Sequence, residues 1–237
     1  MNAASFEIIY HFTLPDRSAT TVELCIDAEQ LNLLNELPRP LPSWTMLGFH
    51  QCPNCTLDAQ TSAICPVAAH LVQILPSCNK LISYDEVDVD VVTSERKISV
   101  HTKAEMAISA MMGLIFATSG CPHMDFFRPM ARFHLPFATQ EETLFRSTGT
   151  YLIGQYLRQR QGHEPDFDLS GLEVIYEEIK TVNRSVAARL RAATKTDSAL
   201  NALVLLDIHA QILPYALKTF LDKLDYLFIP FWMSQCR

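Results

Sequence analysis

The strongest constraint on the fold is the apolar pattern of the C-terminal part of the chain. Apolar side chains recur every three or four residues across residues 170–193 and again across residues 198–224. This spacing places them on one face of an α-helix. The interval between the two segments, residues 194–197, is short, so we expect an antiparallel helical hairpin. Core packing of its apolar faces is the default, and a homodimer or a protein partner at this hairpin is the alternative.

The first hundred residues have the pattern of β-strands instead. Residues 6–14 and 20–26 are rich in β-branched and aromatic types, with the turn residues Pro15-Asp16-Arg17-Ser18 between them. Residues 86–93 and 97–102 alternate between apolar and polar types. Each pair predicts a β-hairpin with one dry face and one wet face. Together they predict a small antiparallel sheet.

Several capping signals predict where helices begin. Asp27 with Gln30 at the third helical position predicts a short helix through Leu37. A proline in the first helical position predicts helix starts directly after Cys65 and Cys121. Three capping boxes mark three further starts: Thr102 with Glu105, Thr139 with Glu142, and Ser170 with Glu173.

These elements predict an α+β fold, in which a small antiparallel sheet of two hairpins packs with a C-terminal helical bundle. Residues 1–102 would form the β-rich part with a cysteine-rich loop, and residues 103–237 the bundle. The two parts are also compatible with one continuous domain. The chain has 237 residues, 49% of them hydrophobic, which is enough for a sizeable core.

The net charge and the hydropathy of the chain exclude some classes of binding partner and location. The formal net charge of -7 argues against a general nucleic-acid binder and against a binder of anionic membranes. The longest apolar stretch, residues 106–120, is shorter than the roughly 20 residues that a membrane span needs, so we expect a core helix there. Residues 1–14 lack a basic end followed by an apolar run. We therefore expect no signal peptide and a cytoplasmic location.

Four of the seven cysteines stand with two histidines in three turn-like pieces: His50-Gln51-Cys52-Pro53-Asn54-Cys55, Cys65-Pro66 and Cys121-Pro122-His123. An odd number of cysteines without an export signal suggests a reducing compartment, where a CxxC motif indicates metal or redox chemistry more often than disulfides. We predict a thiolate-rich metal site whose ligands are Cys52, Cys55, Cys65 and Cys121. His50 and His123 are additional candidate ligands.

The sequence leaves the metal open. Zinc takes four tetrahedral ligands, and four cysteines or three with one histidine would satisfy it. An iron–sulfur cluster also takes four thiolates, and a proline often follows a cluster cysteine. Three of the four cysteines precede proline, which favours the cluster slightly. Cys65 at a helix start would face free amides and the positive end of the helix dipole, so we expect a lowered thiol pKa there. Cys121 would have the same local geometry.

Two other interpretations stay open beside a structural, redox-sensing or accessory metal site. The first is a redox enzyme that uses the cluster or the Cys52/Cys55 dithiol, although the segment after Cys55 does not look like the helix of a thioredoxin-like site. The second is a helical interaction module with incidental cysteines. Arg128 and Arg132 lie four residues apart and are candidate anion-binding residues, with a plain salt bridge as the alternative.

The motifs also resemble those of a known family. They are HxCxxC, the Cys65-Pro66 helix start, Ser119-Gly120-Cys121-Pro122-His123-Met124, and residues 127–134 and 201–207. Together they are similar to an uncharacterised bacterial protein family, and the resemblance covers most of the chain. It implies a shared fold and a shared cysteine set, and it implies no substrate.

Overall fold

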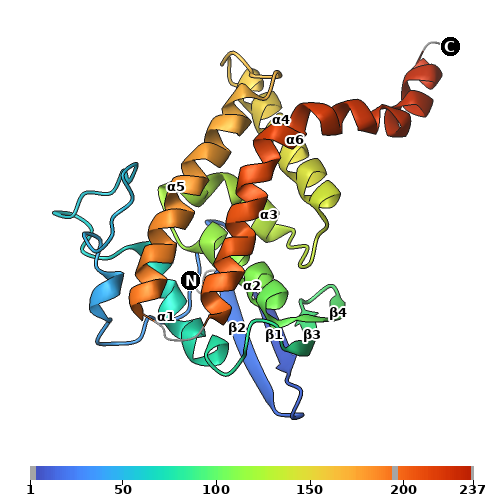
Figure 1. The fold of residues 1–237 in the computed structure, drawn as a ribbon. Coiled ribbons are helices and arrows are strands. Elements are labelled where there is room, and N and C mark those ends of the chain that lie inside the picture. Colours follow the sequence, from blue (N-terminus) through green and yellow to red (C-terminus); the bar gives the residue numbers. More distant parts are fainter. Residues whose placement is uncertain (1–3, 194–196, 236–237) are drawn as a thin grey trace.

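The computed structural model describes residues 4–193 and 197–235, and it confirms the α+β fold (Figure 1). Four antiparallel strands form one sheet in the order β2-β1-β3-β4. Both predicted hairpins are present, with bounds that differ from the expected ones by a single residue. The strands are β1 (Ser5–Thr13), β2 (Ala19–Asp27), β3 (Glu86–Val92) and β4 (Lys97–Lys103).

The helices make up most of the remainder of the described chain. Figure 1 shows α5 and α6 side by side, with the sheet below them and α4 behind α6. Their bounds are η1 (Ser43–Thr45), α1 (Pro66–Cys78), α2 (Ala104–Thr118), η2 (Pro122–Phe127), α3 (Arg128–Arg132), α4 (Gln140–Arg160), α5 (Ser170–Ala193) and α6 (Ser198–Gln235), where η marks a 3-10 helix.

The sheet has one dry face and one wet face, as the alternation predicts. Tyr10 in β1 and Val89 in β3 are buried, together with the neighbours of each on the same face of its strand. The opposite face carries exposed polar pairs, such as Asp90 with Lys97 at 2.9 Å and Asp88 with His101 at 2.8 Å. These carboxylates pair with neighbouring side chains on the solvated face. The alternating aspartates are therefore explained without a bound cation.

The core helix α2 lies where the longest apolar stretch predicts a helix. Ala104, Ile108, Met112 and Ile115 are all fully buried, and α2 packs on β3, β4, α1 and α6. Among the described residues, no single helix is long and apolar enough to cross a membrane. One pair, α2 with Pro122–Arg132, reaches that length and composition when both helices are counted together, and it is bent by 113°.

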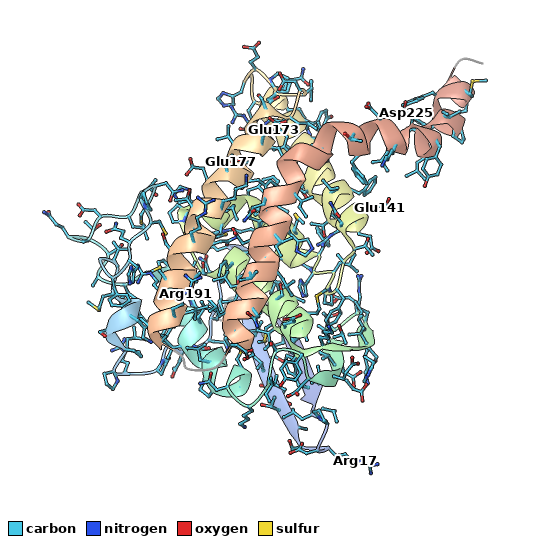
Figure 2. The ribbon with its side chains drawn as sticks, in the orientation of Figure 1. Arg17, Glu141, Glu173, Glu177, Arg191 and Asp225 are labelled. Atoms are coloured by element: carbon cyan, nitrogen blue, oxygen red, sulfur yellow. The ribbon has the colours of Figure 1, made fainter. Side chains whose placement is uncertain are left out.

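The predicted hairpin of α5 and α6 is present. Val186 and Leu190 of α5 and Leu203 of α6 are buried in the core, while Glu177, labelled on α5 in Figure 2, is exposed. The predicted connection lies mostly outside the described residues. One hydrophobic cluster runs from Ile8 to Phe220 and includes residues from both predicted parts of the chain. Beyond this cluster, the end of α6 projects away from the other elements (Figure 1).

The predicted helix over residues 27–37 is wrong. Asp27 Oδ1 accepts hydrogen bonds from the amides of Glu29 and Gln30 at 2.9 and 2.6 Å, as a helix cap would. However, Leu31 adopts a φ of 59°, and Leu33 forms a β-bridge with Ile26. The capping chemistry therefore serves a tight turn that returns the chain to the sheet.

The capping boxes were predicted with mixed success. The box at Thr139 forms, because its hydroxyl accepts from the Glu142 amide and the Glu142 carboxylate accepts from the Thr139 amide. Thr102 instead stays in β4 opposite Val87, and α2 begins after Lys103. The Ser170 hydroxyl donates to Asp166. Thr102 is held in the strand ladder, and the Glu173 amide donates to the Leu169 carbonyl rather than to Ser170, so neither predicted residue caps its helix.

A buried hydrogen bond ties the sheet to the segment that follows α3. The Tyr10 hydroxyl lies 2.6 Å from His134 Nε2. Burial lowers the pKa of His134 to about 3, with Arg146 as a second cause, and burial raises the pKa of Tyr10. Both groups are therefore neutral near pH 7. A neutral tyrosine hydroxyl and a neutral imidazole can share this hydrogen bond without a charge on either group.

This pair predicts a pH dependence of stability. The pKa of His134 is lower in the folded chain than its usual value of 6.5, so the unfolded chain takes the proton first as the pH falls. Stability is complete above pH 6.5 and is lost progressively toward pH 3. Between pH 7 and pH 5 the loss from this group reaches up to about 2 kcal/mol. Urea unfolding of the wild type and of His134→Gln should reveal it as a smaller loss in the variant.

His163 provides the control, because it is an exposed histidine in the loop after α4. His163→Gln should retain the pH dependence of the wild type. Equal pH dependence in the wild type and in His134→Gln would contradict the assignment of a buried neutral imidazole.

Candidate metal centre

The fold brings the four predicted cysteine ligands into one region. Cys52 and Cys55 lie in the loop between η1 and α1, Cys65 precedes α1, and Cys121 precedes η2. A thiolate at Cys121 is repelled by thiolates at the other three positions, and one at Cys52 is repelled by those at Cys55 and Cys65. Because such forces fade beyond about 10 Å in salt solution, this repulsion indicates proximity. All four are free thiols.

Two of these cysteines have the same local geometry, as the Cys-Pro motifs predict. Cys65 caps α1 with φ -75° and ψ 118°, and Cys121 caps η2 with φ -72° and ψ 125°. A proline occupies the first turn in both cases. Gly120 precedes Cys121 with a φ of 85°, a conformation that glycine adopts without the steric cost of a Cβ. This glycine lets the chain leave α2 and present Cys121 at once.

The thiol pKa of Cys121, the other cysteine at a helix start, is raised. Burial raises its pKa to about 12, and the three neighbouring thiolates raise it further, while a hydrogen bond from the His123 amide lowers it. Burial also raises the pKa of Cys52, against smaller lowering effects from Ser185 and Arg189. Desolvation therefore outweighs the helix end. Both thiols are protonated near pH 7 unless a cation replaces the proton.

His123 holds the CxxC turn in place. Its Nε2 donates to the backbone carbonyl of Asn54 at 2.7 Å, and its Nδ1 lies 3.7 Å from a Glu178 carboxylate oxygen. The Asn54 amide donates to the Glu178 carbonyl at 3.2 Å and to the Glu178 carboxylate. His123 thus joins η2, the CxxC turn and α5. His50 is exposed and meets the ring of Phe49 edge-on.

Arg189 of α5 is a buried cation near Cys52 that was not predicted from the sequence. It is 1% exposed, and it donates to the carbonyls of Trp44, Met46 and Leu47 at 2.7–2.8 Å. Its charge lowers the pKa of Cys52. No carboxylate pairs with it in the described part of the chain. Its place between Val186 and Leu190 on the apolar face of a predicted helix was the available signal.

The thiols are close together without forming a finished site. Within residues 4–193 and 197–235, no group of three or more His, Cys, Asp or Glu side chains has the arrangement that holds a metal ion. Zinc–sulfur bonds are about 2.3 Å long. Binding would therefore require the cysteine side chains to turn toward a common centre.

The two arginines predicted to bind an anion already have partners. Arg128 forms an ion pair with Asp125 at 2.8 Å and donates to the Gln30 carbonyl at 2.6 Å. Arg132 stacks over the ring of Phe6, with its guanidinium carbon 5.0 Å from the ring centre. The plain salt bridge is thus formed at Arg128. Anion binding by this pair stays a prediction.

Comparisons with known proteins give one match. A family model described as "Domain of unknown function (DUF6901)" matches residues 8–229. Comparisons with curated proteins and with solved structures find no match. The prediction of an uncharacterised family is confirmed. A bacterial origin and a cysteine set shared across the family stay predictions.

The geometry of Arg189 predicts a large effect on stability. Arg189→Met removes the donors of three carbonyls, and unsatisfied buried groups cost about 1–3 kcal/mol each. The free energy of unfolding in urea should fall by at least about 3 kcal/mol. Arg132→Met is the control, because an exposed cation–π contact contributes about 0.5–1 kcal/mol. Equal losses in the two variants would contradict a structural role for Arg189.

Proposed function

The chain belongs to the DUF6901 family, whose description assigns no activity, and we propose from the site itself that this is a metal-binding protein. Cys52, Cys55, Cys65 and Cys121 hold an iron–sulfur cluster or a zinc ion in a structural, redox-sensing or accessory role. The observation that carries the proposal is the grouping of four free thiols, three of which lie close enough to Cys121 to raise its pKa. Four thiols that oppose each other's ionisation are stabilised together by one shared cation.

Arg189 supports the proposal through charge. Four thiolates around Zn²⁺ leave a net negative charge, and so do four thiolates around an iron–sulfur cluster. A buried guanidinium without a carboxylate partner is costly, and an anionic centre beside it would offset that cost. The charge of Arg189 attracts a thiolate at Cys52 and so lowers the Cys52 pKa, although burial has the larger, opposite effect.

Hydrogen bonds around the cysteine segments also support the proposed metal site. Metal sites depend on outer groups that orient their ligands, and loss of such a group typically weakens metal affinity about 10–100-fold. His123, Asn54 and Glu178 form such a set, because they fix the CxxC turn against η2 and α5. On this proposal His123 orients the ligands, and the fourth ligand is Cys121.

The pattern of three Cys-Pro pairs keeps the iron–sulfur cluster slightly ahead of zinc. The alternative of a redox enzyme that uses the Cys52/Cys55 dithiol is less well supported. A reactive thiol has a lowered pKa, whereas burial raises the pKa of Cys52.

The test is metal analysis of protein purified without air, with visible absorption, for the wild type, Cys121→Ser and Cys25→Ser. Cys25 is the matched control, since it is a half-buried free thiol on β2. The wild type and Cys25→Ser should carry one cluster or one zinc per chain, and Cys121→Ser should lose it. Because Cys52 and Cys121 are protonated near pH 7, the affinity of apoprotein for added zinc should also rise between pH 6 and pH 8.

Iron with acid-labile sulfide and a brown colour would identify a cluster, and one colourless zinc would identify a zinc site. Metal-free wild type that also binds neither added zinc nor a reconstituted cluster would contradict the proposal.

A second candidate function is protein interaction through the end of α6. Residues 226–233 expose six large apolar side chains to 48% or more, among them Tyr226 at 69% and Trp232 at 48%. A helix that is apolar on all sides is normally buried on all sides. Of the possible occupants we propose a second copy of this chain, because the same segment in the partner offers the matching apolar surface and gives a closed two-fold contact.

Sedimentation equilibrium tests this dimer. The double variant Phe228→Ser/Trp232→Ser should shift the mass from dimer to monomer at equal concentration, since it removes two large apolar side chains from the contact. Tyr84→Ser, which alters an aromatic residue that is 67% exposed elsewhere, should leave the mass unchanged. A monomeric wild type would exclude the dimer.

A further inference from the structure

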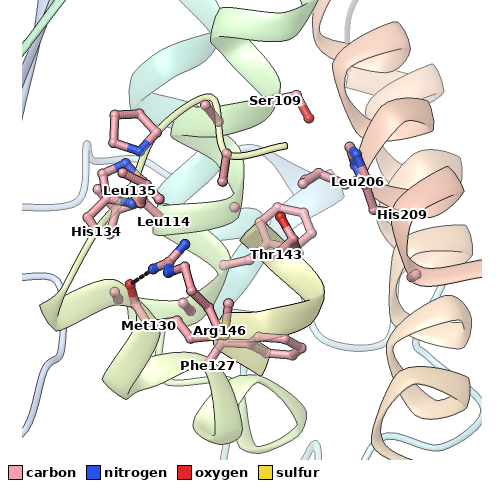
Figure 3. Close-up of a pocket in the computed structure, with 18 of the residues that line it drawn as sticks. Ser109, Leu114, Phe127, Met130, His134, Leu135, Thr143, Arg146, Leu206 and His209 are labelled. Carbon is pink, nitrogen blue, oxygen red and sulfur yellow. Dashed lines mark hydrogen bonds between the residues drawn. The ribbon is translucent and has the colours of Figure 1, made fainter. Parts of the chain in front are cut away.

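A cavity of about 230 Å³ lies between α2 and α6, apart from the cysteines (Figure 3). Its walls come from α2, η2, α3, α4, α5, α6 and the segment 134–138. They are mainly apolar, and Leu114, Phe127, Met130 and Leu206 are among them. Such a lining suits a small organic molecule with an apolar body.

Arg146 of α4 is the one permanent charge among the described residues that line the cavity. Its Nη2 donates to the carbonyls of Met130 and Phe133, each at 2.9 Å, so the guanidinium is held in position (Figure 3). The nearby Glu142 carboxylate accepts the Thr139 amide at the start of α4. No ion pair to Arg146 is found in the described ranges. Burial lowers the pKa of Arg146, which indicates that its charge is partly desolvated.

Asn183 of α5 supplies a second, independent sign of a missing partner. Its side chain lines the same cavity and is 3% exposed. Its Nδ2 is buried and makes no hydrogen bond within the described chain. A buried amide donor without an acceptor is costly. A ligand oxygen in the cavity would satisfy it.

We propose that this cavity binds a small monocarboxylic acid with an apolar body. The carboxylate lies against Arg146 and accepts from the Asn183 amide, and the apolar body packs between α2 and α6. A guanidinium and an amide together suit a carboxylate, because a carboxylate accepts several charge-assisted hydrogen bonds. The apolar walls select against inorganic anions, which would lose their hydration without compensating donors. The site is separate from the proposed metal centre and does not depend on it.

Octanoate is the probe, and octan-1-ol is its uncharged counterpart with the same chain length. Calorimetric titration of the full chain should give one octanoate per chain. Octan-1-ol should bind at least ~10-fold more weakly, because it lacks the charge-assisted hydrogen bonds. Inorganic phosphate should not compete with octanoate.

Three variants separate binding from folding. Asn183→Leu removes an amide that has no partner to lose, so it should keep its melting temperature and still bind octanoate about 10-fold more weakly. Arg146→Met should weaken octanoate by at least ~10-fold and leave octan-1-ol unchanged. Arg128→Met is the matched control, since Arg128 also donates to a carbonyl and does not line the cavity.

Failure of the wild type to bind octanoate would overturn the proposal. So would equal affinity for octanoate and octan-1-ol together with no effect of Asn183→Leu, because the cavity would then be a general apolar void. Cys121→Ser should bind octanoate like the wild type, which keeps this result distinct from the outcome of the metal analysis.

Discussion

The buried guanidinium of Arg189 is the interaction on which the arrangement of the loops depends. It joins the C-terminal part of α5 to three backbone carbonyls of one short segment, those of Trp44, Met46 and Leu47. Those residues precede the CxxC turn, and the Thr45 carbonyl accepts the amide of Cys65. One side chain therefore fixes both the entry to the cysteine loop and its exit. Its charge is compensated by carbonyl dipoles in the described structure, and a thiolate centre beside it would complete that compensation.

Local sequence patterns predicted the elements well where the residues have no competing partner. Alternation located both hairpins, and the three-to-four periodicity located α5 and α6, because burial of one face fixes each period. The patterns failed where a neighbour in space intervened. Residues 27–37 have helix-capping chemistry, but the bridge of Leu33 to Ile26 returns them to the sheet. Thr102 has a capping partner in sequence, but the ladder with β3 retains it.

The features of the candidate sites that depend on local sequence were also predicted, whereas those that depend on neighbours in space were not. Motif spacing was enough to group the four cysteines, since two Cys-Pro helix starts and one CxxC turn are local features. The raised pKa of Cys121 could not be predicted from the sequence, because desolvation depends on which residues cover the thiol in the fold. The cavity beside Arg146 could not be predicted from the sequence either. Seven segments contribute to its walls, and the binding residues suggested by sequence in two of them, His123 of η2 and Arg128 and Arg132 of α3, do not line it.

The short helix η2 belongs to both regions at once. His123 donates to the CxxC turn, while Met124 and Phe127 line the cavity. The helix has only six residues, so these contacts lie within about two turns of each other. A rigid displacement of η2 would move residues of both regions together. If occupation of one region changes the affinity of the other, thermodynamic reciprocity requires an equal factor in the reverse direction. A double variant with one substitution on each side of η2 would measure this factor directly, because additive changes in free energy would mean that the two regions are independent.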